Sequence, residues 1–129
     1  MKIFIVDDDE LVHKLYEMYF KKVVSITHKE SFFNGFDAIK FIEDHIDTNL
    51  SDVDIILLDI NMPIMDGVEF LDHFERIAPR LNKIPSIFIV SSCLIEKDFL
   101  MSRKYVTGLH DKPLSELILK NMIFNQVSI

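Results

Sequence analysis

Basic residues are scarce in this chain. It holds 14 Lys and Arg residues against 21 Asp and Glu residues, which gives a formal net charge of -7 and a pI near 5.1. Nucleic acids and anionic lipids are bound by clustered Lys and Arg side chains. The shortage argues against an electrostatic footprint for either partner, so we expect a protein that binds no nucleic acid and no membrane by itself.

Cysteine and long hydrophobic runs are also lacking. The only cysteine, Cys93, excludes an internal disulfide framework, and we expect it to pack as a small apolar residue. No apolar run approaches the ~20 residues that a membrane-spanning helix needs. Asp7 interrupts the N-terminal apolar run too early for a signal peptide. We therefore expect a cytoplasmic location.

The chain is nevertheless apolar enough to fold. Its 129 residues are the size of one domain, 49% of them are hydrophobic, and the mean hydropathy is +0.20. No internal repeat, low-complexity tract or linker divides it. We expect a single domain over residues 1–129.

Strand-like and helix-like patterns alternate along the chain. Short apolar or β-branched runs predict strands at 2–6, 23–27, 53–58, 84–90 and 105–109. Apolar residues at helical spacing predict helices at 11–19, 36–42, 66–77, 96–102 and 114–125. In the first of these, the expected apolar face consists of Leu11, Leu15, Met18 and Tyr19. Strands that are apolar on both faces and alternate with helices indicate a parallel sheet with helices on both faces. The predicted fold class is α/β, a doubly wound five-stranded parallel sheet.

Charged and polar residues follow several of these predicted strands. Asp7 and Asp8 end the first strand, Asp59 ends the third, Ser91 ends the fourth and Lys112 follows the fifth. Open parallel sheets bind ligands outside the carboxyl ends of their strands, so all five residues are expected to meet at one edge. Three carboxylates in one cleft repel one another unless a cation joins them. Mg²⁺ fits, because it takes oxygen ligands and needs few carboxylates.

The remaining acids and the histidines have simpler explanations. Asp9 is either a helix N-cap or a further site residue, and both readings stay open. Asp66 is expected to be structural, because Asp66-Gly67-Val68-Glu69 resembles a capping box. A surface position is expected for each histidine, and only one of them falls near the acids at a strand end. The five are His13, His28, His45, His73 and His110.

Four motifs together resemble the receiver domains of two-component response regulators. They are Asp7-Asp8, LLDINMPIMDG at 57–67, IVSS at 89–92 and DKP at 111–113. The resemblance covers essentially the whole chain and is closest to the chemotaxis-regulator type, apparently a stand-alone receiver. It implies a flavodoxin-like fold with strand order 2-1-3-4-5, and a phosphoprotein that catalyses only its own phosphorylation and dephosphorylation rather than an enzyme with an outside substrate.

The resemblance also implies roles for individual residues. Asp59 would accept the phosphoryl group and contact the metal, Asp8 would bind Mg²⁺ directly and Asp7 through water. The backbone carbonyl of Asn61 would complete the protein ligands.

Two further residues are expected to respond to phosphorylation. Ser91 would hydrogen-bond one phosphoryl oxygen and Lys112 would pair with another, while the Lys112-Pro113 bond is expected to be cis. Ser91 and Leu109 would form the switch. Leu109 departs from the family pattern, which has Tyr or Phe at that position.

Partners follow from the same resemblance. A histidine kinase or a histidine phosphotransfer protein would donate the phosphoryl group. A downstream protein would bind the surface formed by 96–102, 105–109 and 114–125. The last predicted helix is apolar around much of its circumference, which is consistent with a protein partner, with a second copy of the chain or with a wider core contact.

Other classes fit less well. Haloacid-dehalogenase-like phosphatases have a second Asp where this chain has Asn61, and a calcium loop counted from Asp59 would need glycine where Ile64 stands. A nucleotide binder would need a glycine- or hydroxyl-rich loop after the first strand. Two alternatives stay open: a receiver-like scaffold that binds proteins without phosphorylation, and the receiver fragment of a longer regulator with a missing effector domain.

Overall fold

The computed structural model describes residues 1–48, 52–92 and 94–127, so the expected packing of Cys93 lies outside the described residues. The strands are β1 (Lys2–Val6), β2 (His28–Phe32), β3 (Ile55–Leu58), β4 (Ser86–Ser91) and β5 (Val106–Asp111). The helices are α1 (Glu10–Phe20), α2 (Gly35–Asp44), α3 (Gly67–Ile77), α4 (Lys97–Ser102) and α5 (Glu116–Val127), and the short 3₁₀ helix η2 (Ala78–Arg80) follows α3.

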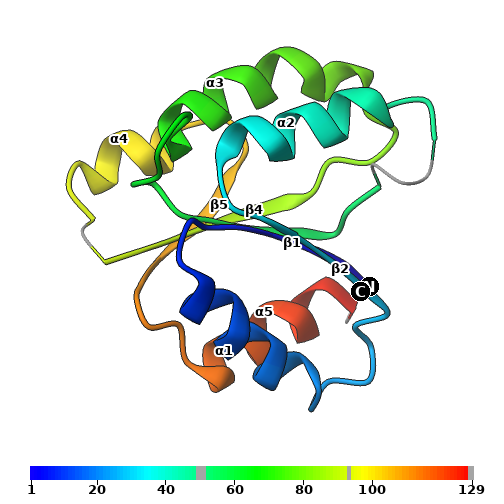
Figure 1. Ribbon diagram of the computed structural model, residues 1–129, viewed down its shortest axis with the longest axis vertical. Helices are drawn as coiled ribbons and strands as arrows, with labels where there is room; N and C mark the ends of the chain where they lie inside the picture. Colours follow the sequence, from blue (N-terminus) through cyan, green and yellow to red (C-terminus); the bar gives the residue numbers. More distant parts are fainter. Residues whose placement is uncertain (49–51, 93, 128–129) are drawn as a thin grey trace.

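All five strands are parallel and lie in the order β2-β1-β3-β4-β5, which confirms the predicted fold class and strand order. Helices α2, α3 and α4 cover one face of the sheet, and α1 and α5 cover the other (Figure 1). Alternate residues of the central strands enter the two cores: Phe4 packs under α2 and α3, and Ile5 packs under α1 and α5. The continuous apolar runs are therefore buried on both sides.

The second strand was predicted in the wrong place. Residues 23–27 form the turn that leaves α1, where Val24 is 97% exposed and the N–H of Val23 bonds the carbonyl of Phe20. The strand is His28–Phe32, whose residues are mostly exposed or half-buried. Because β2 is an edge strand, it tolerates polar residues that a central strand would not, and β-branched residues were a misleading signal.

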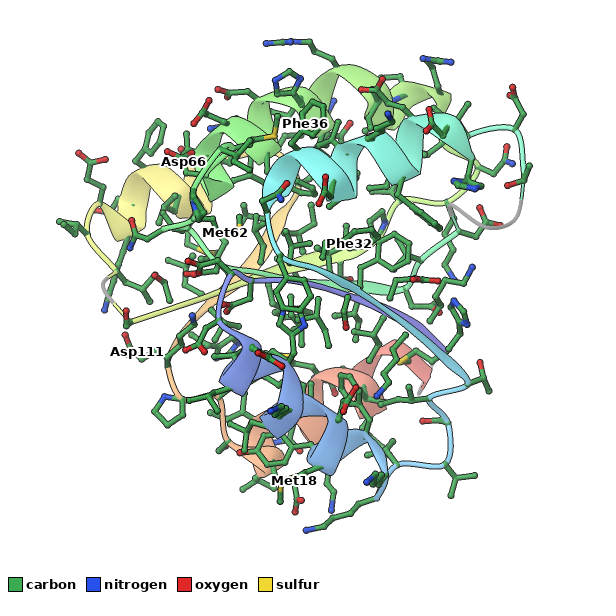
Figure 2. All side chains as sticks on the ribbon, viewed as in Figure 1. Met18, Phe32, Phe36, Met62, Asp66 and Asp111 are labelled. Carbon is green, nitrogen blue, oxygen red and sulfur yellow. The ribbon has the colours of Figure 1, made fainter. Side chains whose placement is uncertain are left out.

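The buried face of α1 also differs from the prediction. Leu11 and Met18 are 72% and 61% exposed, and Figure 2 shows Met18 directed away from the sheet. The buried stripe consists of His13, Tyr16 and Phe20, which follow helical spacing equally well. His13 is therefore not the surface residue that we expected.

Helix N-termini place the loops at the carboxyl edge of the sheet. The carboxylate of Asp9 accepts from the N–H of Leu11 at 2.9 Å and caps α1. Asp66 and Glu69 form the predicted capping box at the start of α3. A Cβ on Gly67 would lie 2.5 Å from the carbonyl oxygen of Asp59, so only glycine lets α3 begin this close to the end of β3.

Candidate functional site

Three carboxylates converge where β1 and β3 end. Asp7, Asp8 and Asp59 each offer an oxygen within 4.8 Å of the others. Parallel pairing brings them together, because Val6 lies opposite Leu58 and the N–H of Asp59 bonds the carbonyl of Val6 at 2.9 Å. Asp7 and Asp59 are buried, whereas Asp8 is exposed. The site is thus a buried pair of acids with a third at its mouth.

Lys112 joins the two buried acids. Its ammonium nitrogen lies 2.8 Å from Oδ2 of Asp7 and 3.3 Å from Oδ2 of Asp59. The backbone N–H of Lys112 donates to the carbonyl of Ser91 at 3.0 Å. The Lys112-Pro113 peptide bond is cis, as the resemblance implied. The ammonium group of Lys112 therefore lies between the two buried carboxylates.

The charges of this cluster shift one another's pKa. Burial and the charge of Asp7 raise the pKa of Asp59, although Lys112 and the N–H of Asn61 act in the opposite direction. Burial alone would lower the pKa of Lys112, but the contacts with Asp7 and Asp59 raise it. The protein alone therefore leaves the ionised Asp59 only partly compensated, which favours an additional cation.

Ser91 presents a buried hydroxyl without a partner. The residue ends β4 with no exposed surface, and within the described ranges its Oγ makes no hydrogen bond. Buried hydroxyl groups normally find a partner, because desolvation without one is unfavourable. This hydroxyl is thus free to bond a group that enters the site beside Lys112.

The loop after β3 carries the other expected ligand. Asn61 is exposed, and its N–H donates to the carboxylate of Asp59, while a role for its carbonyl stays a prediction. The N–H of Met65 bonds the carbonyl of Pro63 at 2.8 Å across Ile64, whose φ is +70°. This three-residue turn is of the rare, strained kind.

Leu109, the other expected switch residue, lies in β5 opposite Ile89. It is half-buried and packs against the core on the face of the sheet that α2, α3 and α4 cover. Its apolar side chain offers no group to the chemistry of the acids, so it stays a candidate for transmission.

His13 is the neighbour of the site that sequence reasoning missed. Its Nε2 lies 2.7 Å from the carbonyl oxygen of Asp7, and the residue is 5% exposed. The available signal was the spacing of His13, Tyr16 and Phe20, which marks one helical face as clearly as the leucines did.

The donor set fits a hard cation. All three clustered side chains offer carboxylate oxygens, the ligands that Mg²⁺ prefers, and the exposed Asp8 leaves one side open to water. Within the described ranges, none of the helices has the length and apolar character that crossing a bilayer requires.

Comparison with known families decides the identity of this arrangement. The model of the response regulator receiver domain matches residues 3–113, which include the acids, Ser91 and Lys112. The chain belongs to this family. Receivers are in general signalling modules of two-component systems rather than enzymes.

Individual relatives agree with the assignment. The receiver is 32% identical over 123 residues to the transcriptional regulatory protein FlgR of Helicobacter pylori, a match that covers 95% of this chain but 29% of FlgR. A two-component response regulator from Cytophaga hutchinsonii has a solved structure with a TM-score of 0.85 and 25% identity, covering 99% of this chain and 97% of that one. A response regulator from Legionella pneumophila gives a TM-score of 0.80 at 25% identity over 100% and 99% of the two chains.

Proposed function

We propose that residues 1–129 form one receiver domain that accepts a phosphoryl group on Asp59. The donor is a histidine kinase or a histidine phosphotransfer protein, and the reaction depends on Mg²⁺. The observation that carries this proposal is the position of Asp59, a buried carboxylate that shares Lys112 with Asp7.

Phosphoryl transfer to Asp59 requires little covalent chemistry from the protein. A carboxylate oxygen of Asp59 attacks the phosphorus of a phosphohistidine, a P–O bond forms while the P–N bond breaks, and the imidazole nitrogen leaves with the electron pair and takes up a proton. Lys112 pairs with one phosphoryl oxygen, and the unpartnered hydroxyl of Ser91 donates to another. The product is a mixed anhydride, which water hydrolyses, so the signal is temporary.

Asp7, Asp8 and Asp59, with the carbonyl of Asn61, would hold the metal ion. When bound, Mg²⁺ supplies positive charge that neutralises the carboxylates and the phosphoryl oxygens. Asp8→Ala is therefore expected to slow phosphorylation at limiting Mg²⁺.

Transmission is proposed to use the face formed by α4, β5 and α5. Met101 of α4 is 46% exposed, and Ile118 of α5, which lies beside Thr107 and His110 of β5, is 38% exposed. Large exposed apolar side chains favour contact with a protein. A downstream partner or a second copy of the receiver would cover them.

The decisive test is the intact mass after incubation with acetyl phosphate, with and without Mg²⁺. The parent should gain one phosphoryl group in the presence of Mg²⁺, and Asp59→Asn should gain none. Asp54→Asn is the matched control, because Asp54 is also a carboxylate paired with a lysine, Lys83, but lies at the opposite end of β3. Equal labelling of Asp59→Asn and the parent would overturn the assignment.

A further inference from the structure

His13 contacts the peptide group that joins two of the three acids. Its Nε2 lies 2.7 Å from the carbonyl oxygen of Asp7, in the peptide bond between Asp7 and Asp8. A carbonyl oxygen only accepts hydrogen bonds, so Nε2 carries the hydrogen and donates it. Because the contact is buried, water does not compete for this carbonyl.

Asp7 is held at every other polar group as well. Its N–H donates to the carbonyl of Phe32 at 3.0 Å, its Oδ1 accepts from the N–H of Asp9 at 2.9 Å, and its Oδ2 accepts from Lys112 at 2.8 Å. The carboxylate of Asp8, in contrast, is exposed and has no hydrogen bond or ion pair within the described ranges. The direction of Asp8 is therefore set by its backbone, and the peptide before it is the one that His13 contacts.

Packing alone does not explain a histidine at this position. The ring lies against Phe33 with centroids 4.3 Å apart, and its Nδ1 is buried with no partner among the described residues. An apolar side chain would fill the same space without an unpaired nitrogen, whose burial is unfavourable. The feature that histidine adds is the hydrogen bond to Asp7.

We propose that His13 is a positioning residue of the acidic site: it fixes the Asp7-Asp8 peptide and thereby orients the Asp8 carboxylate for metal binding. The inference rests on the proposed function only in that a divalent cation binds this site. Groups that orient metal ligands from behind commonly change metal affinity 10–100-fold when removed.

His45 provides a matched control for a purely structural role. Its Nδ1 lies 2.7 Å from the carbonyl oxygen of Phe41, and its ring lies against the Phe41 ring with centroids 4.2 Å apart. The two histidines thus make the same pair of contacts, but the carbonyl that His45 binds belongs to α2, on the other face of the sheet. Loss of either contact should lower thermal stability, and only loss of the first should alter metal binding.

The test is a Mg²⁺ titration followed by amide chemical shifts. His13→Leu should bind Mg²⁺ about tenfold more weakly than the parent. His13→Gln, whose Nε2 can donate from a similar distance, should recover most of the affinity. His45→Leu should bind as the parent does. Parental affinity in His13→Leu would overturn the proposal, and so would an affinity of His13→Gln as low as that of His13→Leu.

A measurement on the unmodified protein remains informative if His13→Leu does not fold. The ring N–H signal of His13 should shift when Mg²⁺ is added, whereas the ring N–H signal of His45 should not. An unmoved His13 signal would refute the inference. Phosphorylation by acetyl phosphate is read separately: its failure in a parent that binds Mg²⁺ would reject the proposed function and leave the role of His13 intact.

Discussion

At the scale of single residues, the negative charge of Asp59 destabilises the folded protein. The pKa of Asp59 is raised, so the folded protein holds a proton there more readily than the unfolded chain does. Stability linked to Asp59 is therefore lost as the pH rises above its ordinary pKa of 3.8. Asp54 behaves in the opposite way. Burial alone would raise its pKa, but the hydrogen bonds from Lys83 and from the N–H of Lys2 lower it below the ordinary value. Asp54 thus adds stability that is lost as the pH falls.

This contrast predicts opposite effects of two equivalent substitutions. In metal-free buffer at pH 7, Asp59→Asn should raise the melting temperature by about 3 °C. The substitution removes an unfavourable charge, while Lys112 retains its ion pair with Asp7. The gain should fade as the pH approaches 3.8. Asp54→Asn should lower the melting temperature at pH 7. Thermal melts in EDTA across this pH range measure both, and a destabilised Asp59→Asn at neutral pH would show that the acids are not crowded.

Ile64 stores strain next to the site. It is β-branched, 78% exposed and has a φ of +70°, a region that costs an ordinary residue about 1–2 kcal/mol. Ile64→Gly should stabilise the protein by about 1 kcal/mol in chemical denaturation, since little burial is lost and part of the gain is offset by the freer unfolded chain. Ile95→Gly is the control, because Ile95 is 71% exposed but has no positive φ. That variant should be slightly destabilised; a similar gain in both would exclude backbone strain as the cause.

At the scale of elements, sequence patterns correctly predicted the central strands, which must be apolar because both of their faces are buried. The runs Ile3–Val6 and Ile55–Leu58 were predictable because central parallel strands must be apolar throughout. The edge strand β2 was not predicted, because solvent contacts one side of it and polar residues are therefore compatible with a strand there. The spacing of His13, Tyr16 and Phe20 could have predicted that His13 is buried, but it does not encode the hydrogen bond of His13 to a carbonyl outside the helix.

The carboxylates, Ser91 and Lys112 were predictable for a different reason. Each follows or ends a strand, and a parallel sheet brings all carboxyl ends to one edge whatever the details of packing. The contacts between these side chains were not predictable. The sharing of Lys112 by Asp7 and Asp59 depends on side-chain directions that only the folded chain fixes.

Arg103 connects the end of helix α4 to α3. Helix α4 has six residues, and Glu96 before it has a φ of +58° and gives no side-chain cap. Arg103 ends the helix, and its Nη2 donates to Asp72 at 2.6 Å and to Glu75 at 2.5 Å, both on α3. The arginine side chain is 12% exposed, so these bonds are better shielded than ordinary surface ion pairs.

Arg103→Met should therefore loosen α4 more than the rest of the fold. We expect a loss of about 1–2 kcal/mol in unfolding free energy, since the methionine keeps the apolar stem but loses the charged bonds to α3 and the contact of the guanidinium with the Phe99 ring. Hydrogen exchange should accelerate most at the amides of α4. Arg76→Met, on the exposed surface of α3 and without an ion pair among the described residues, should change neither quantity. Equal acceleration in all helices of Arg103→Met would mean that the arginine supports the whole fold.

At the scale of the whole molecule, the proposed coupling between the site and the α4-β5-α5 face would pass through the neighbouring strands β4 and β5. Ser91 and Leu109 belong to these neighbouring strands, and the expected coupling would move both. The family has an aromatic ring where Leu109 stands. The aromatic side chain of Tyr105, which precedes β5, packs edge-on against Phe74 of α3 with ring centroids 5.4 Å apart. That ring is already committed to a core contact.

Leu109 should consequently transmit the phosphoryl state only weakly. A phosphoryl group shifts an equilibrium by its differential interaction with two states, and a half-buried leucine has less surface and no polar tip with which to distinguish them. With beryllofluoride as the phosphoryl mimic, amide shifts should be large around Asp59 and Ser91 and small along β5 and α5. Leu109→Tyr should extend the shifts toward α5, and Leu109→Val should not. Large shifts along β5 and α5 in the parent would refute this and would show that another residue, such as His110, whose ring lies 6.0 Å from that of Phe88, carries the signal instead.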